Sequence, residues 1–594
     1  MIILPDSSLS KTCTTIKELS MKAYSVISLF IASLILVACT SDQGNEQRSE
    51  AEHSSAASQT TSTSASAETE RPNFLIVMAD DLGFTDIGVF GSEIRTPTID
   101  ELASESLSFN QFYASPNCSP SRSMLMTGLD HHFTGFATMQ DHIADNQRGQ
   151  PGYEGYIPEH VATLPEVMQA NGYHTSMSGK WHLGAAPGRR PIDKGFDRST
   201  ALMQGGAAHL NLDKMLSVFP ETVIFEDNVK VESVPDDFYS SKYYADNMIE
   251  YIDDALAQDK PFFGWLAFTA PHWPLQVPDE HIDLYAGEYD GGYDLLRETR
   301  LQDAIAAGLV PPEVNEVPRL ERVIPWDELS EDEKRYQARI MEIYAAMVER
   351  LDYHMSRVID HLVEAGEYDN TLIIFMSDNG AEGHDRMQLL DNATWVPANY
   401  DLSYEQLGRA GSYTILGPGW GQAAVAPLRL FKAYTTEGGI RVPFIVKPPG
   451  ANGDAQWVSS VATIQDIMPT LMEYAGIENH GSNYMGREVY PMTGRSMLPL
   501  IEGESDQIYA EDEPLGWEIF GHRALRKGDW KALWADGANG SDTWQLYNLT
   551  EDPREINDLS AEFPEKLAEL VADWEEYAEN NQVVLPIGDM GNPN

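Results

Sequence analysis

Two pairs of polar residues stand where apolar segments of the chain end. The pairs are Asp80 with Asp81, and Asp378 with Asn379. They follow continuous apolar runs, 74–78 and 371–376, whose length and character predict buried parallel strands. Ligands of such sheets gather beyond the carboxyl ends of the strands. If the two strands are neighbours, three carboxylates and one carboxamide converge, and this oxygen set favours Ca²⁺ or Mg²⁺. Either pair alone is equally typical of a loop or a helix cap.

A lone cysteine among polar residues is the second chemical feature. Residues 118–122 read Cys-Ser-Pro-Ser-Arg, and Pro120 is suited to the first turn of a helix. Cys118 would then lie at the helix N-terminus, where free N–H groups favour anions. Arg122 follows four residues later, on the same face of the helix. This cationic neighbourhood favours a reactive cysteine over the alternative, a buried structural one.

The elements that must position these residues belong to an α/β domain. Apolar runs predict buried strands at 74–78, 261–268, 371–376 and 441–446. Apolar residues between 340 and 362 recur at helical spacing, which predicts a long amphipathic helix before the strand at 371–376. This alternation predicts a large, mostly parallel (mixed) sheet flanked by helices. The acidic segment 280–335 has weak periodicity, and we expect an insertion on the rim of the domain.

The sequence changes in character after about residue 480. Short apolar runs separated by turn-forming residues lie at 517–525, 530–534 and 544–549. Residues 564–580 read as an amphipathic helix. We therefore predict a main domain over 71–480 and a small C-terminal α+β subdomain with an antiparallel sheet over 481–594.

Two sequence signatures resemble those of type I sulfatases, a family of the alkaline phosphatase-like superfamily. Residues 118–128 are similar to the first signature and residues 172–183 to the second. Further similar segments lie at 80–83, 127–132, 152–156, 270–272, 377–380 and 437–441. The resemblance covers residues 71 to 575 and points to the bacterial arylsulfatase branch. It implies the fold described above and an arylsulfatase-like activity on sulfuric esters.

The resemblance also implies a metal site and a modified nucleophile. The residues that match the family's Ca²⁺ ligands are Asp80, Asp81, Cys118, Asp378 and Asn379, with Mg²⁺ as the alternative ion. Cys118 would be oxidised after translation to formylglycine by a separate maturation enzyme. The hydrated aldehyde would attack sulfur through one hydroxyl and expel sulfate through the other, whereas a serine or a thiol has no second hydroxyl.

Five further residues match the family's active-site positions. Arg122 would hold the side chain of residue 118, and Lys180 and Lys432 would grip the sulfate oxygens. His272, aided by Lys432, would protonate the leaving alcohol or phenol, and His182 or Asp378 would accept the last proton.

Other histidines and tryptophans near these motifs receive structural interpretations. We expect His131, His132 and His209 to be solvated or internally hydrogen-bonded. We expect Trp181 and Trp273 to form walls of the pocket, but these two residues do not identify the substrate.

Two other functions remain open on the sequence. Phosphonate monoester or phosphodiester hydrolases of the same superfamily share the machinery. A non-catalytic surface lipoprotein that binds sulfated glycans would instead keep Cys118 unmodified and hold no metal. For a sulfatase, the leaving group could be a phenol, a steroid or a sulfated sugar.

The N-terminal region predicts export and anchoring. Val26–Ala38 is apolar and too short for a confident membrane span, and it ends at Cys39 in a segment that resembles a bacterial lipobox. We therefore expect a signal peptide over 1–39, whether translation starts at Met1 or at Met21. Residues 40–70 hold no aromatic or branched aliphatic side chain, which predicts a disordered tether. The expected location is the periplasm or cell surface, with a lipid anchor in the outer membrane.

Composition excludes several other classes of protein. The 594 residues contain 40 Lys and Arg against 92 Asp and Glu, a formal charge of −52. This excess of acid disfavours nucleic acids and anionic lipid surfaces as partners. The hydrophobic fraction of 42% is enough for a sizeable core, and three cysteines are too few for a disulfide framework.

Overall fold

The computed structural model describes residues 71–388, 392–451, 453, 455–535 and 537–587. The predicted signal peptide, lipobox and tether lie outside these ranges and stay predictions. Within the described ranges, no helix combines the length and the apolar character needed to cross a bilayer.

A large mixed sheet forms the centre of the described chain. Its strands are β1 (Asn73–Ala79), β2 (Leu107–Tyr113), β3 (His174–Lys180), β4 (Arg198–Leu202), β5 (Ile224–Glu226), β6 (Val229–Lys230), β7 (Phe262–Ala267), β8 (Thr371–Ser377), β9 (Arg441–Lys447), β10 (Gln456–Val458) and β11 (Ala462–Thr463). Their order is β10-β2-β9-β8-β1-β7-β3-β4-β5-β6, and β11 pairs with β2. Strands β8, β1, β7, β3 and β4 are parallel neighbours, whereas β9 is antiparallel to both β8 and β2. The prediction of a mostly parallel, mixed sheet is confirmed.

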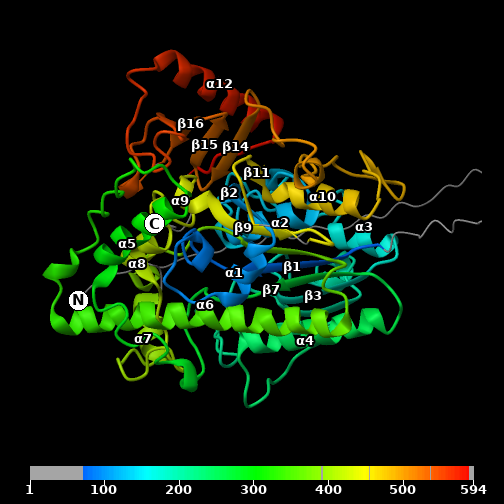
Figure 1. The fold of residues 1–594 in the computed structure, drawn as a ribbon, viewed down its shortest axis with the longest axis horizontal. Coiled ribbons are helices and arrows are strands. Elements are labelled where there is room, and N and C mark those ends of the chain that lie inside the picture. The colour runs from blue at the N-terminus through cyan, green and yellow to red at the C-terminus, as the bar shows by residue number, and fades with distance from the viewer. Residues whose placement is uncertain (1–70, 389–391, 452, 454, 536, 588–594) are drawn as a thin grey trace, which may run out of the picture. The chain divides into compact units, whose positions relative to one another are not determined.

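Helices cover both faces of this sheet. One face packs against α1 (Pro97–Ser104), α4 (Ser240–Leu256) and α6 (Glu331–Ala365), and the other against α2 (Cys118–Thr127), α3 (Leu164–Ala170) and α10 (Ile467–Tyr474). In β1, Leu75 and Val77 join the first core cluster, while Phe74, Ile76 and Met78 join the second. Burial on both faces explains why this strand is apolar throughout. The long helix α6 packs beside α4 over part of its length (Figure 1).

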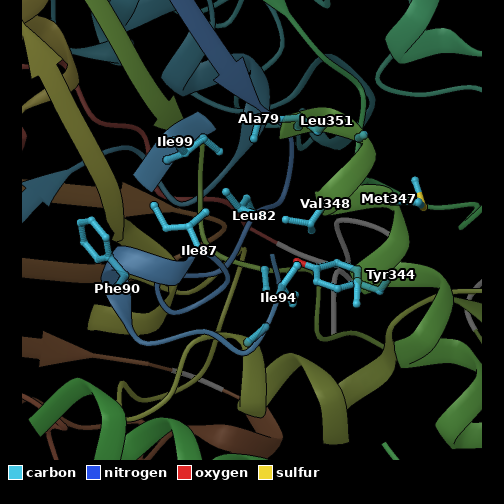
Figure 2. Packing of buried hydrophobic residues seen from close by; sticks show 14 of the residues in the cluster. Ala79, Leu82, Ile87, Phe90, Ile94, Ile99, Tyr344, Met347, Val348 and Leu351 are labelled. Carbon is cyan, nitrogen blue, oxygen red and sulfur yellow. The ribbon is translucent and has the colours of Figure 1, made fainter. Parts of the chain in front are cut away.

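The segment after β1 packs tightly on α6. Figure 2 shows Leu82 and Ile94 of this segment beside Tyr344 and Val348 of α6. The hydroxyl of Tyr344 donates to Asp86 Oδ2 over 2.6 Å. The loop that begins with Asp80 and Asp81 is therefore fixed against the longest helix.

The interpretation of 280–335 as a rim insertion is wrong in part. This segment contains α5 (Gly292–Ala306), whose apolar residues join the main core cluster. The buried face of α5 also carries Arg300, which is 0% exposed and pairs with Asp86 at 2.5 Å and Glu93 at 2.9 Å. Arg300, whose charge is balanced by these carboxylates, occupies a buried position of α5 and interrupts the apolar periodicity of the helix. The apolar pattern alone therefore does not predict α5.

The described residues form further α-helices outside those that cover the large sheet. They are α7 (Asn392–Asn399), α8 (Gly417–Ala424), α9 (Glu437–Ile440), α11 (Leu498–Ile501) and α12 (Pro564–Asn580). The two short strands β12 (Asn483–Tyr484) and β13 (Arg487–Glu488) pair with each other.

A second, antiparallel sheet forms near the C-terminus, as predicted. Its strands are β14 (Pro514–Ile519), β15 (His522–Lys527), β16 (Trp530–Trp534) and β17 (Gln545–Asn548), in that order. Helix α12 packs across it through Leu570 and Trp574 (Figure 1). The predicted domain boundary at residue 480 stays a prediction.

A buried ion network joins the small sheet to the main sheet. Lys531 of β16 lies 2.8 Å from Glu437 and 2.7 Å from Glu555, and all three side chains are 0% exposed. Glu437, which precedes β9, also accepts a hydrogen bond from Tyr113 of β2 over 2.8 Å. The network thus links β16 to residues of the large sheet.

Replacing Lys531 by methionine should destabilise the fold markedly. The change leaves Glu555 without its paired cation and leaves Glu437 with the more distant Arg441, 3.9 Å away. Breaking a buried ion pair in this way costs about 3–5 kcal/mol. Urea titration followed by fluorescence would measure the change in the free energy of unfolding.

Lys527→Met is the matched control, because Lys527 pairs with Glu569 and Asp573 at the surface, where such pairs contribute about 1 kcal/mol or less. Equal destabilisation by both changes would contradict our prediction that the buried ion network stabilises the fold more than the surface ion pairs.

Candidate active site

The two pairs of polar residues at the strand ends meet, as the sequence predicted. Strands β1 and β8 are parallel neighbours with Ala79 opposite Ser377, so the residues that follow them leave the sheet at the same edge. The Asn379 side chain donates to Asp81 Oδ1 over 2.8 Å. The backbone N–H of Asp81 donates to Asp378 Oδ1 over 3.2 Å.

Cys118 faces these carboxylates from the N-terminus of α2. Its N–H donates to the side chain of Asn117, which precedes the helix, and its Sγ lies 3.6 Å from Asp80 Oδ1 and 3.7 Å from Asp81 Oδ1. Burial raises the pKa of the Cys118 thiol far above its usual range. Without an additional positive charge nearby, burial favours the protonated thiol, which is a poor nucleophile.

Three cations surround the same point. Lys180, at the end of β3, lies 2.7 Å from both carboxylate oxygens of Asp80. Lys432 lies 2.6 and 2.8 Å from the oxygens of Asp81 and 3.2 Å from Cys118 Sγ. Arg122, one turn along α2 from Cys118, places Nε and Nη2 each 2.8 Å from Asp378 Oδ2. Three buried carboxylates are thus matched by three buried cations.

Burial and charge act in opposite directions on these groups. Burial raises the pKa of Asp80 to about 7, although Lys180 beside it acts to lower that pKa. Burial also acts to raise the pKa of Asp378, but Arg122 and Lys180 outweigh it and hold that pKa below its usual value. An additional positive charge at this point would keep Asp80 ionised at neutral pH.

The donor set fits a hard divalent cation. Asp80, Asp81, Cys118 and Asp378 each offer a ligand atom, and these atoms all lie within 4.8 Å of one another. Asn379 Oδ1 is buried and has no hydrogen-bond partner among the described residues. An orphaned buried oxygen beside three carboxylates is the chemistry that Ca²⁺ or Mg²⁺ satisfies.

His272 approaches the cluster from the loop after β7. Its Nδ1 lies 2.6 Å from the carbonyl oxygen of Trp273, and its Nε2 lies 3.5 Å from Asp81 Oδ2. Because a carbonyl only accepts, Nδ1 carries the hydrogen, and Nε2 is the nitrogen presented to the site. Burial, Lys432 and Lys180 together hold the pKa of His272 well below its usual value.

His182 lies beside the cluster rather than within it. None of the hydrogen bonds found in the described chain joins it to another of the predicted site residues, and its Nδ1 is buried without a partner. A Cβ on Gly205 would lie 2.7 Å from its Cε1, so glycine at 205 leaves room for the ring. Burial, followed by Lys180, holds the pKa of His182 well below its usual value.

The structural expectations for the tryptophans and histidines near the motifs are confirmed in part and corrected in part. Trp181 is 0% exposed and packs on Trp265 with ring centroids 6.2 Å apart, so it belongs to the core and is not a pocket wall. Trp273 stacks on His272 at 4.9 Å, beside the site as expected. His132 is buried and lies 2.8 Å from Asp130, so the expectation of an internally hydrogen-bonded histidine is confirmed.

Three residues near the site escaped the sequence analysis. Glu382 is buried beyond β8 and binds His384 at 2.6 Å and Arg386 at 3.0 Å. Its charge acts on both Lys432 and His272. No motif in the sequence distinguishes these residues from ordinary loop residues, because Lys432 and His272, on which the charge of Glu382 acts, become its neighbours only in the fold.

Comparison with known proteins identifies the family. The family model described as Sulfatase matches residues 72–477, and the model described as N-sulphoglucosamine sulphohydrolase, C-terminal, matches residues 429–582. The chain therefore belongs to the type I sulfatase family of the alkaline phosphatase-like superfamily and is a sulfuric ester hydrolase. This result disfavours the alternative of a non-catalytic lipoprotein.

Individual relatives agree with this assignment. An uncharacterized sulfatase of Schizosaccharomyces pombe is 41% identical over 543 residues, covering 88% of this chain and 96% of the relative. An arylsulfatase of Klebsiella aerogenes is 37% identical over 437 residues, covering 73% and 93%. The crystal structure of Ps i-CgsB in complex with k-i-k-neocarrahexaose has a TM-score of 0.61 at 25% identity, covering 86% and 94%.

Proposed function

We propose that this enzyme is an arylsulfatase-like hydrolase that uses a formylglycine formed from Cys118 and a bound Ca²⁺. The observation that supports the proposal best is the buried, charge-balanced cluster around Cys118 Sγ. The arylsulfatase of Klebsiella aerogenes, at 37% identity, supports the same type of activity.

Asp80, Asp81, Asp378 and Asn379 would hold the Ca²⁺, together with the side chain of residue 118. The ion would supply positive charge that keeps a hydroxyl at position 118 deprotonated and offsets charge on the ester. The formylglycine would supply a nucleophilic hydroxyl together with a second hydroxyl on the same carbon. Arg122 bridges Asp378 and the backbone carbonyl of Lys180, so it keeps the start of α2 in register with the strand ends.

The two lysines are placed to bind the sulfate group. Lys180 and Lys432 flank Cys118 from two sides, each paired with a different aspartate. Fixed cations in a dry site stabilise charge that develops as the S–O bond breaks.

His272 presents Nε2 to the same space. A proton taken up at Nε2 when the anionic ester binds would make the ring our candidate for the proton donor to the leaving oxygen. His182, two residues after Lys180 and under the influence of its charge, and Asp378 are our candidates for the base that takes the last proton.

Charge balance leads to a preference among esters. The protein's own charges in the cluster cancel, so a divalent ion leaves two positive charges in excess. One offsets the deprotonated hydroxyl at position 118, and the other offsets a singly charged sulfate ester. A phosphate monoester carries about one further negative charge at neutral pH, which nothing in the cluster offsets.

The decisive experiment compares matched aryl esters on the mature, Ca²⁺-loaded enzyme. We expect kcat/KM for 4-nitrophenyl sulfate to exceed that for 4-nitrophenyl phosphate by at least ~100-fold, or about 2.7 kcal/mol in the barrier. A phenylphosphonate ester carries the same single negative charge as a sulfate ester, so charge alone does not separate these two substrates. This ester therefore tests the alternative of phosphonate ester hydrolysis. A higher kcat/KM for the phosphonate than for the sulfate would replace our proposal by phosphonate ester hydrolysis.

We also propose that the enzyme is exported and anchored by a lipid on Cys39, at the periplasm or cell surface. The support is the apolar run Val26–Ala38 and the lipobox-like segment that ends it. For the natural substrate, we propose that the leaving group is a phenol or a sulfated carbohydrate.

A further inference from the structure

His209 is a buried histidine directly behind His272. It lies in the loop between β4 and β5 and is 0% exposed. Its backbone N–H donates to Gln276 Oε1 over 2.9 Å, and its carbonyl accepts from the N–H of Ser240, the first residue of α4, over 2.9 Å. The residue is therefore anchored on two sides before its ring is considered.

The ring of His209 has one arrangement of hydrogens that satisfies both nitrogens. Nε2 lies 2.9 Å from the carbonyl oxygen of His272, and Nδ1 lies 2.7 Å from Ser240 Oγ. The carbonyl only accepts, so Nε2 carries the hydrogen, and Nδ1 accepts from the Ser240 hydroxyl. Burial lowers the pKa of His209 to about 4, in agreement with a neutral ring.

This hydrogen bond completes the support of His272. The N–H of His272 donates to the carbonyl of Thr269 over 2.9 Å, and its ring Nδ1 donates to the carbonyl of Trp273 over 2.6 Å. The carbonyl of His272 accepts from His209. Of these three bonds, only the one from His209 comes from a side chain of another segment.

The loop that carries His209 also contacts the ring of His272. A Cβ on Gly206 would lie 3.0 Å from both Nδ1 and Cε1 of His272 and 2.6 Å from Met215 Sδ. Backbone of this loop therefore passes close to the imidazole. A change at His209 would be transmitted to His272 over one hydrogen bond and a packed loop.

We propose that His209 is a positioning residue that holds His272 for proton transfer to the leaving oxygen. This inference rests on the proposed role of His272. Misplacement of a proton donor by about 1 Å can cost ~100-fold in rate, and general acid catalysis contributes ~100-fold or more. The loss of rate should be largest for substrates whose leaving oxygen must be protonated as it departs.

The test uses two substitutions that separate the two ring contacts. His209→Gln can place an amide N–H near the position of Nε2 and keep the bond to the His272 carbonyl. His209→Asn is too short for that bond and retains only the contact with Ser240. Tyr251→Phe is the matched control, because it removes a buried 2.7 Å hydrogen bond to Thr200 that has no contact with His272.

The readout is kcat/KM for a series of aryl sulfates on Ca²⁺-loaded, formylglycine-containing enzyme. The series runs from 4-nitrophenyl sulfate, with an acidic phenol, to phenyl sulfate, whose phenol has a pKa of about 10. We expect His209→Asn to lose ~30-fold on phenyl sulfate and less than ~3-fold on 4-nitrophenyl sulfate. His209→Gln and Tyr251→Phe should keep the wild-type dependence on the leaving group.

Crystal structures of the variants provide a readout that does not depend on turnover. We expect the His272 ring to leave its position 3.5 Å from Asp81 in His209→Asn and to keep it in His209→Gln. An unmoved ring, or an equal loss for every leaving group, would overturn the positioning role. If the wild type hydrolysed no sulfate ester, the proposed function would fail, while the ring positions would still decide whether His209 holds His272.

Discussion

Replacing Cys118 by alanine should abolish sulfate ester hydrolysis and leave the fold intact. The side chain lies within 3.7 Å of two of the aspartates proposed to bind Ca²⁺ and 3.2 Å from Lys432, and our proposal places the nucleophile at this position. Loss of a covalent nucleophile lowers kcat by ~10⁴-fold or more. The measurement is kcat/KM for 4-nitrophenyl sulfate, with circular dichroism and the thermal midpoint as checks on folding.

Cys118→Ser is the matched control for this prediction. Serine retains one hydroxyl at the same place but has no second hydroxyl on the same carbon, so we expect at most a single slow turnover. Mass spectrometry of the tryptic peptide 96–122 from the wild type should show the thiol replaced by a carbonyl oxygen. Full activity of an enzyme whose peptide carries only a thiol would contradict the formylglycine mechanism.

Removal of Ca²⁺ should cost activity far more than stability. Without the ion, each of the three carboxylates still has a buried cation within 2.8 Å, so the cluster stays neutral and the fold should persist. Catalysis, by contrast, would lose the positive charge that we propose keeps the nucleophile deprotonated, and we expect kcat to fall by ~10³-fold or more. Dialysis against a chelator, followed by activity assays and thermal unfolding, measures both effects.

Re-addition experiments identify the ion. We expect Ca²⁺ to restore activity to the dialysed enzyme at a lower concentration than Mg²⁺, because several carboxylate and carboxamide oxygens can surround the larger ion. Asp81→Asn should raise the Ca²⁺ concentration needed for half-maximal recovery. Undiminished activity in the chelated enzyme, with metal content verified as negligible, would exclude a metal from the mechanism.

Much of the site could be predicted from sequence because its residues occupy the ends of strongly apolar strands. Asp80 and Asp378 follow such strands directly, and a parallel pair places its carboxyl ends at one edge. Cys118 and Arg122 lie one turn apart on the same helix, so their common face depends only on helical periodicity. Lys180 and His272 were assigned through the resemblance to type I sulfatases rather than through spacing.

Other features depend on contacts between segments that are far apart in the chain. The buried Arg300 interrupts the apolar pattern of α5, and its partners Asp86 and Glu93 lie more than 200 residues away. Trp181 looked like a pocket residue beside Lys180, yet its ring turns into the core. In both cases local sequence shows which residue is present but not which neighbour it meets.

The sequence by itself determined the fold class and the family and predicted the set of reactive residues, because apolar periodicity and motif spacing are local properties of the chain. Only the tertiary structure decided that the charges around Cys118 balance, that Lys531 joins the two sheets, and that His209 supports His272. Each of these depends on the position of one buried polar group relative to another segment. Such groups are stable only when paired, and the fold alone specifies the pairs.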